Sequence, residues 1–265
     1  MVKRLWLLVA ATLLFIALCQ PFLQARPTLY QTEKRAALAL AEQAQALLGP
    51  RISGPEYSWI TTTLAPPEAK RLSRHPDFAA VAVGWLKQAG AGPGSRVAVN
   101  LSGSFPALNI AVLAAIEAVG AQPVITSSVG ASTWGATDPE FTWLGMEREL
   151  TAAGLWRSRT VAASLGGVGD AGGGLTPEGK ELARSAIRRS GAELIAAADL
   201  RGAIGRRLQL YRGGAGELPP LLVNVGGSHV LFGEAGHRAP LPQGLKRGYH
   251  PLLGAQDGLA AAFLQ

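Results

Sequence analysis

Apolar segments alternate with short loops of serine and glycine in residues 96–139. A short apolar run, Val97 to Leu101, leads into Ser102-Gly103-Ser104, and a nearly unbroken apolar helical pattern follows from Pro106 to Val119. A second β-rich run, Pro123 to Thr126, ends in another loop of serines and glycines, Ser127 to Gly135. This order predicts a strand, a helix and a strand of a parallel sheet, because parallel strands need a long crossover connection.

The same alternation continues on both sides of this segment. It predicts further helices over residues 32–48, 78–88, 141–153, 176–190 and 199–211, and further strands over residues 160–165, 193–195 and 221–225. Residues 51–67, rich in proline, are expected to form a loop, and the nine residues GGVGDAGGG at 166–174 another. Helices that alternate with strands predict an α/β fold with a mostly parallel sheet and helices on both faces.

The N-terminus predicts a single transmembrane helix in front of this domain. Lys3 and Arg4 precede LWLLVAATLLFIALC, and the charge-free stretch extends to Ala25. About 20 apolar residues suffice to span a bilayer as a helix. A cleaved signal peptide and a lipoprotein modified at Cys19 are the alternatives. The two N-terminal cations favour a cytoplasmic N-terminus, so we expect a single-pass protein of the cell membrane with an extracytoplasmic main domain.

These patterns predict three regions. Residues 1–25 are the membrane anchor or signal peptide, residues 26–76 a helix and a linker, and residues 77–265 the α/β domain. The chain ends at Gln265 within an apolar segment, which predicts that this domain is C-terminally truncated.

Composition narrows the expected partners. The net charge of +7 favours anionic partners such as phosphates, anionic lipids or a polyanionic polymer. Nucleic acid is not expected, because there is no aromatic RNA-binding signature and no basic helix of the DNA-reading type. The single cysteine excludes an internal disulfide, and neither metal-ligand spacing nor an ATP or NAD motif occurs, so we expect no metal and no cofactor.

Small polar residues follow the predicted strands. Ligands of parallel sheets bind at the carboxyl ends of the strands, and glycines there leave backbone N–H groups uncovered for an oxyanion. Trp134 is a candidate pocket wall, Asp138 a candidate base or cation ligand, and Asn109 a candidate brace between the loops. The predicted ligand-binding residues are Ser102, Gly103, Ser104, Asn109, Ser127, Ser128, Gly130, Ser132, Trp134 and Asp138.

A catalytic interpretation uses overlapping residues. Ser104 or Ser128 would be a nucleophile, and Asp170 or His229 its base. Each has a plainer explanation: Ser104 as a helix N-cap, and Asp170 as a turn residue among glycines. No Gly-x-Ser-x-Gly motif supports the nucleophile. The sequence therefore does not identify the catalytic residues.

Four segments resemble the poly-gamma-glutamate system protein family. They are GSFPALNIAVLAAIEA (103–118), SSVGASTWGATDPEFTWL (127–144), AASLGGVGDAGGGLTPEG (162–179) and NVGGSHV (224–230). The resemblance covers residues 77–230, and it departs from the expected pattern at Gly145, where an aspartate is expected. It implies a bacterial membrane protein of poly-γ-glutamate capsule biosynthesis or export, without established catalytic residues to transfer.

The sequence is therefore compatible with three alternative functions. The first is an accessory component that binds the anionic polymer or a precursor at the Ser/Gly loops. The second is a hydrolase or transferase that acts on γ-glutamyl amide bonds with a serine nucleophile. The third is a non-catalytic scaffold subunit of a membrane complex, in which these loops pack against partner proteins.

Overall fold

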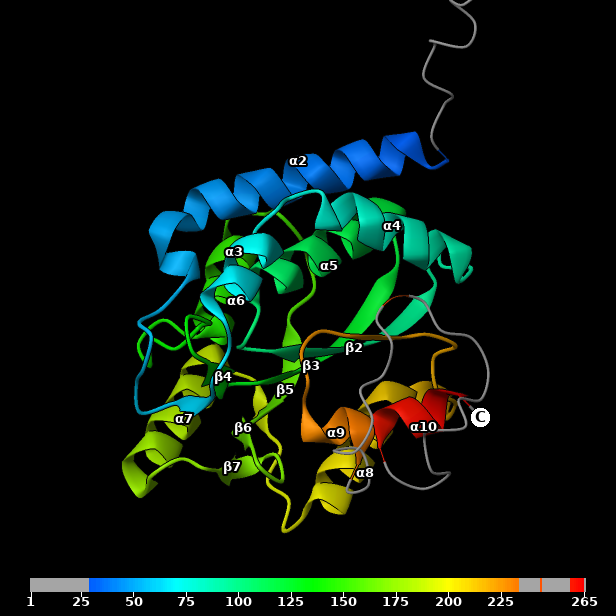
Figure 1. The fold of residues 1–265 in the computed structure, drawn as a ribbon. Helices are drawn as coiled ribbons and strands as arrows, with labels where there is room; N and C mark the ends of the chain where they lie inside the picture. Colours follow the sequence, from blue (N-terminus) through cyan, green and yellow to red (C-terminus); the bar gives the residue numbers. More distant parts are fainter. Residues whose placement is uncertain (1–28, 234–243, 245–257, 265) are drawn as a thin grey trace, which may run out of the picture. The chain divides into compact units, whose positions relative to one another are not determined.

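The computed structural model describes residues 29–233, residue 244 and residues 258–264 (Figure 1). The chain divides into two units, residues 1–31 and residues 32–265, and every described strand lies in the second unit.

A five-stranded parallel sheet is the main feature of the second unit. Its strand order is β8-β5-β3-β2-β9, so β3 is the central strand. All four pairings are parallel, which confirms the predicted α/β fold with a mostly parallel sheet. The strands are β2 (Arg96–Ser102), β3 (Gln122–Ser128), β5 (Thr160–Ser164), β8 (Glu193–Leu194) and β9 (Leu222–Asn224).

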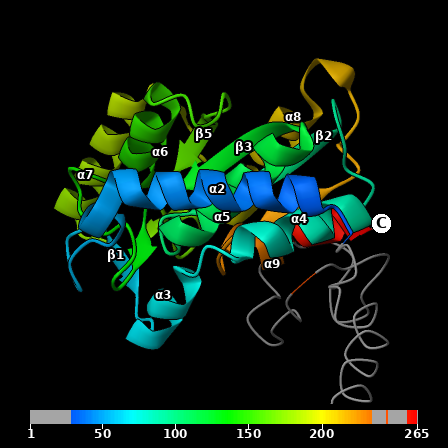
Figure 2. The same cartoon turned by 90° about the horizontal axis from the view of Figure 1, so that it is seen from above.

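Helices lie on both faces of the sheet (Figures 1 and 2). On one face, α5 packs against α4, and α2 crosses above them; on the other lie α8, α9 and α10. The helix α5 is buried almost all round because it is covered by the sheet on one side and by helices on the other. The helices are α2 (Gln31–Leu48), α4 (Phe78–Gln88), α5 (Pro106–Val119), α6 (Trp143–Ala152), α7 (Pro177–Ser190), α8 (Leu200–Arg212), α9 (His229–Phe232) and α10 (Leu259–Leu264).

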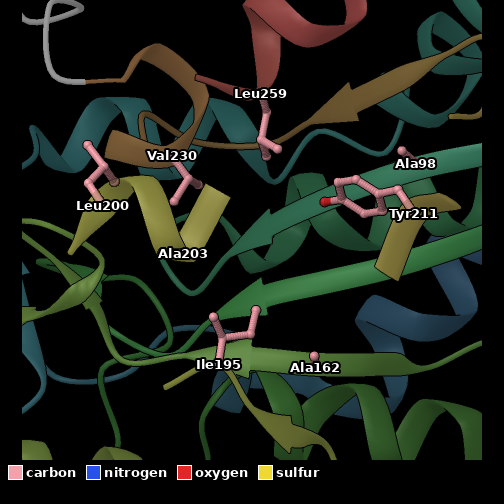
Figure 3. Close-up of a cluster of buried hydrophobic side chains, with 8 residues drawn as sticks. All are labelled: Ala98, Ala162, Ile195, Leu200, Ala203, Tyr211, Val230 and Leu259. Atoms are coloured by element: carbon pink, nitrogen blue, oxygen red, sulfur yellow. The ribbon is translucent and has the colours of Figure 1, made fainter. Parts of the chain in front are cut away.

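A cluster of buried apolar side chains joins the sheet to α8, α9 and α10 (Figure 3). The fully buried residues of the strands in this cluster are alanines, and the partly buried Val124 and Leu222 of β3 and β9 pack against it. The cluster consists of Ala98, Ala162, Ile195, Leu200, Ala203, Tyr211, Val230 and Leu259.

The segment predicted as a loop contains regular structure. Strand β1 (Thr61–Thr63) pairs in parallel with β4 (Ala131–Ser132), and helix α3 (Pro67–Ser73) follows it. The loop prediction for residues 51–67 was wrong in part, because three consecutive threonines show no apolar alternation and β1 forms only against its distant partner. The remaining short elements are β6 (Gly166–Gly167), β7 (Ala171–Gly173) and single 3-10 turns at Gly49–Ile52 and Gly213–Ala215.

The predicted membrane anchor, residues 1–25, lies outside the described residues, as does Cys19. Within the described part of the chain, no helix has the length and hydrophobicity needed to cross a bilayer.

Candidate functional site

The loops after β2 and β3 lie side by side, as predicted. Ser102 is paired in register with Ser128, and the backbone N–H of Gly103 donates to the Ser128 carbonyl at 3.0 Å. Further along, the backbone N–H of Ser132 donates to the Ser104 hydroxyl at 3.0 Å. The two loops are therefore one hydrogen-bonded unit at the carboxyl edge of the sheet.

The predicted oxyanion donors are not uncovered. Besides the Gly103 bond, the Gly130 N–H donates to the Leu165 carbonyl at 2.9 Å. A Cβ at Gly103 would lie 2.6 Å from the Val129 carbonyl oxygen, and one at Gly130 would lie 2.6 Å from Thr62 Cγ2. The expectation of free N–H groups was wrong, because these glycines serve close packing of neighbouring loops.

Asn109 has the bracing position that was expected. Its amide nitrogen donates to the Ser102 carbonyl at 2.9 Å, and the side chain is fully buried in the first turn of α5. Its Oδ1 is buried and has no hydrogen-bond partner in the described part of the chain. Asn109 thus fixes the end of β2 against the helix that follows it.

Two other predicted ligand residues, Asp138 and Ser127, make local structural contacts, and a third, Trp134, has an unusual backbone conformation. Asp138 accepts the backbone N–H of Glu140 at 2.9 Å, which is the turn geometry of the plainer explanation. The Ser127 hydroxyl contacts Thr160 Oγ1 at 2.7 Å inside the protein, away from the loop. Trp134 is half-buried and has a φ of 61°, a left-handed conformation that is rare for a large side chain.

The proposed serine pairings with Asp170 and His229 are absent from the described structure. Neither Ser104 nor Ser128 bonds to them there; the serine at Asp170 is Ser164, with Oγ 2.7 Å from Asp170 Oδ1. His229 Nδ1 instead accepts the backbone N–H of Gly169 at 3.3 Å.

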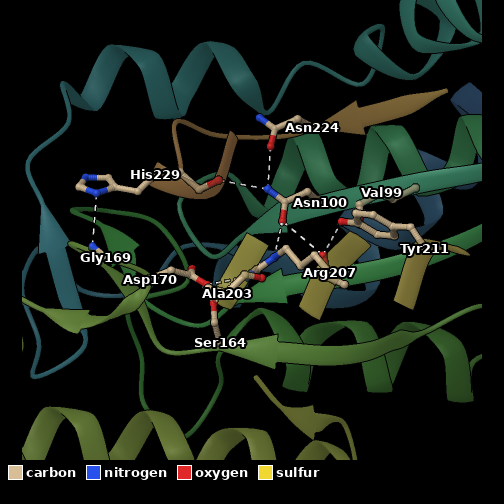
Figure 4. Close-up of polar contacts among 12 residues, drawn as sticks. Val99, Asn100, Ser164, Gly169, Asp170, Ala203, Arg207, Tyr211, Asn224 and His229 are labelled. Carbon is tan, nitrogen blue, oxygen red and sulfur yellow. Dashed lines mark hydrogen bonds and ion pairs between the residues drawn. The ribbon is translucent and has the colours of Figure 1, made fainter. Parts of the chain in front are cut away.

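Asp170 itself is held in a buried ion pair (Figure 4). Arg207 of α8 donates to Asp170 Oδ2 at 2.6 Å, and the two side chains are 0% and 2% exposed. Arg207 also donates to the Ser164 hydroxyl and to Asn100 Oδ1. A carboxylate so engaged is poorly suited to act as a base, and its role is to tie the Gly166–Gly174 loop to α8.

Asn100 connects this ion pair to the last strand (Figure 4). Its amide nitrogen donates to Asn224 Oδ1 at 2.7 Å and to the Ser228 hydroxyl at 3.1 Å. Here β2 leads to α5 on one face and β9 to α9 on the other, which is the change of direction where open parallel sheets often bind ligands. Gly226 approaches Ser102 so closely that a Cβ would lie 2.9 Å from the Ser102 Cβ.

Lys70 is a residue that sequence reasoning missed. It extends from α3 to the joined loops, where its ammonium donates to the Ser104 carbonyl and, at 2.6 Å, to the Ser132 hydroxyl. The nitrogen also lies 4.0 Å from the centroid of the Phe105 ring. No carboxylate among the described residues lies within ion-pair distance of it.

Burial changes the acidity of Lys70. The residue is 6% exposed, and removal from water lowers the pKa of its ammonium to about 8. Little in the sequence indicated this role, since Lys70 is a single lysine in the predicted linker and resembles any surface lysine. The burial of Arg207 could have been predicted more easily, because it lies four residues from both Ala203 and Tyr211 on the face of α8 that packs against the sheet.

No group of three potential metal ligands is present among residues 29–233, 244 and 258–264. Comparisons with protein-family models, with curated proteins and with solved structures found no match. The resemblance to the poly-gamma-glutamate system protein family therefore stays a prediction.

Proposed function

We propose that the chain is a membrane-anchored accessory component of poly-γ-glutamate biosynthesis or export, which binds the anionic polymer or a precursor. In this proposal residues 1–25 anchor a single-pass protein in the cell membrane, and the α/β unit lies outside the cytoplasm. The proposed contact site consists of the joined loops Ser102–Ser104 and Ser127–Ser132 together with Lys70.

The supporting observation is the ammonium of Lys70, which has no carboxylate within ion-pair distance among the residues that the structure describes. Burying a cation without an opposite charge is unfavourable, and a ligand carboxylate would remove that penalty. An ammonium has three N–H donors, and contacts to Ser104 and Ser132 use two of them. The net charge of +7 would add a long-range attraction for a polymer with one carboxylate per residue.

Binding should depend on salt, on pH and on Lys70. Full-length protein in detergent micelles would be titrated with poly-γ-glutamate at low and moderate salt, with a neutral polymer of equal length as the control. We expect weaker binding at moderate salt, because exposed charges are screened. Affinity should also fall as pH rises through about 8, where Lys70 loses its proton.

A matched pair of variants tests the site itself. Lys70→Met should weaken binding by about tenfold or more, since a hydrogen bond between charged groups contributes about 1.5–3 kcal/mol. Arg71→Met removes the same charge from an exposed position on the same helix and should have a much smaller effect. Equal effects of the two variants would contradict the site, and no binding at low salt would contradict the proposed direct contact.

A further inference from the structure

The contact between Lys70 and Ser132 has the composition of a nucleophile and its general base. We propose that Ser132 and Lys70 form a catalytic pair for acyl transfer, with Ser132 Oγ as the nucleophile and the neutral Lys70 amine as the base. The substrate class is an amide or ester whose carbonyl carbon can reach Ser132. This activity goes beyond polymer binding and does not depend on it.

The first argument is the geometry of the two atoms. Lys70 Nζ lies 2.6 Å from Ser132 Oγ, within the range for direct proton transfer. The two residues are 62 positions apart in the sequence, and they are 6% and 4% exposed. A lysine can replace histidine as the base for a serine nucleophile when its amine is partly neutral.

The second argument is the surroundings of the amine. Ser104, Ser132 and Phe105 supply its polar and aromatic contacts, and none of these groups is ionised at neutral pH. The other charged residues of α3, Glu68 and Arg71, are exposed. Desolvation therefore lowers the pKa of Lys70 to about 8, so that a useful fraction of the amine is neutral near physiological pH.

The third argument is the backbone that presents Ser132. The Ser132 N–H is bonded to the Ser104 hydroxyl, and the Ser132 carbonyl accepts the Gly135 N–H at 2.9 Å. Inside this turn Trp134 has a φ of 61°. A strained residue that is held by its neighbours is a feature often found at active sites. Ser132 is thus in a fixed position before any substrate binds.

The reaction requires only Ser132, Lys70, the substrate and water. Ser132 Oγ forms a bond to the carbonyl carbon while its proton passes to Lys70 Nζ. The resulting ammonium gives that proton to the leaving nitrogen or oxygen as its bond to the carbonyl carbon breaks. Water then attacks the acyl-serine, Lys70 accepts a proton from it, and Ser132 leaves with that proton, which releases a carboxylic acid.

The test is covalent labelling of the full chain in detergent micelles. A small fluorophosphonate probe should modify Ser132, located by peptide mass spectrometry, and Ser132→Ala should abolish this label. The labelling rate should rise about tenfold per pH unit below the pKa of Lys70 and level off above about 8. Lys70→Arg keeps the charge but removes the base, so the rate should fall at least about 100-fold.

Folding is checked separately by circular dichroism, with Arg71→Met as the variant that should keep full labelling. If Ser132→Ala does not fold, Ser132→Cys takes its place. The thiol of Ser132→Cys should then be alkylated faster than the same thiol in a protein that also carries Lys70→Arg. The proposal is overturned by absence of labelling, by labelling of another serine, or by an undiminished rate in folded Lys70→Arg. Polymer binding is measured without the probe, so either proposal can fail while the other holds.

Discussion

At the scale of single residues, Glu147 shows how burial sets a protonation state. Its carboxyl group accepts the Thr160 N–H at 2.9 Å and the Thr160 hydroxyl at 3.0 Å. Desolvation nevertheless outweighs these bonds and raises the pKa of Glu147 to about 7. Near neutral pH the side chain is therefore divided between its protonated and ionised forms.

Glu147→Gln should remove a pH dependence of stability. The pKa is about 7 in the folded chain and 4.5 as the ordinary value, so the folded state binds this proton more tightly. The stabilisation that Glu147 contributes is fully present below about pH 4.5. It is lost as the pH rises through about 7. Relative to wild type, the free energy of unfolding of the glutamine variant should rise by about 3 kcal/mol between pH 4.5 and pH 8, since each pKa unit corresponds to about 1.4 kcal/mol.

Urea unfolding at several pH values measures this difference. The exposed Glu42→Gln is the control, and its stability should follow that of the wild type at every pH. If the free energies of unfolding of wild type and Glu147→Gln instead differ by the same amount from pH 4.5 to pH 8, that result would contradict the raised pKa of Glu147.

At the scale of elements, the ion pair between Asp170 and Arg207 connects a glycine-rich loop to α8 beneath the sheet. Arg207 contacts Asp170, Ser164 and Asn100, which come from the loop, β5 and β2. A buried charge without a partner is costly, so each member of this pair depends on the other.

Removal of either partner should be strongly destabilising. Asp170→Asn and Arg207→Met should each lower the free energy of unfolding by about 3–5 kcal/mol, since each leaves the other group buried and unpaired. The double variant should lose clearly less than the sum, because no charge is then stranded. Chemical denaturation of the four proteins gives the coupling energy, and additive losses would contradict a direct interaction.

At the scale of the whole unit, strand order predicts local stability. The central strand β3 has neighbours on both sides, whereas the edge strand β8 has only two residues, both exposed. Native-state hydrogen exchange should therefore be slowest for amides of Ile125–Ser127 and of the neighbouring Ala98–Leu101, and much faster at Glu193 and Leu194. Protection of β8 equal to that of β3 would contradict this strand order.

The sequence alone was sufficient for the fold class and for most elements. Strands and helices that are buried on both sides appear in the sequence as nearly continuous apolar runs bounded by Ser/Gly turns, so β2, α5 and β3 were predicted within a few residues. The adjacency of the Ser102–Ser104 and Ser127–Ser132 loops also followed, because consecutive parallel strands joined by a helix lie next to each other.

Only the tertiary structure determined which polar groups meet. The loop N–H groups of Gly103 and Gly130 are bonded to carbonyls, and Asp170 is bonded to Arg207 instead of to a catalytic serine. Lys70 meets Ser132 across 62 positions, through a short helix and a strand with no periodic signal. Local patterns determine which faces are buried, whereas the partner of a buried charge is decided by chain segments that are distant in sequence and come together only in the folded protein.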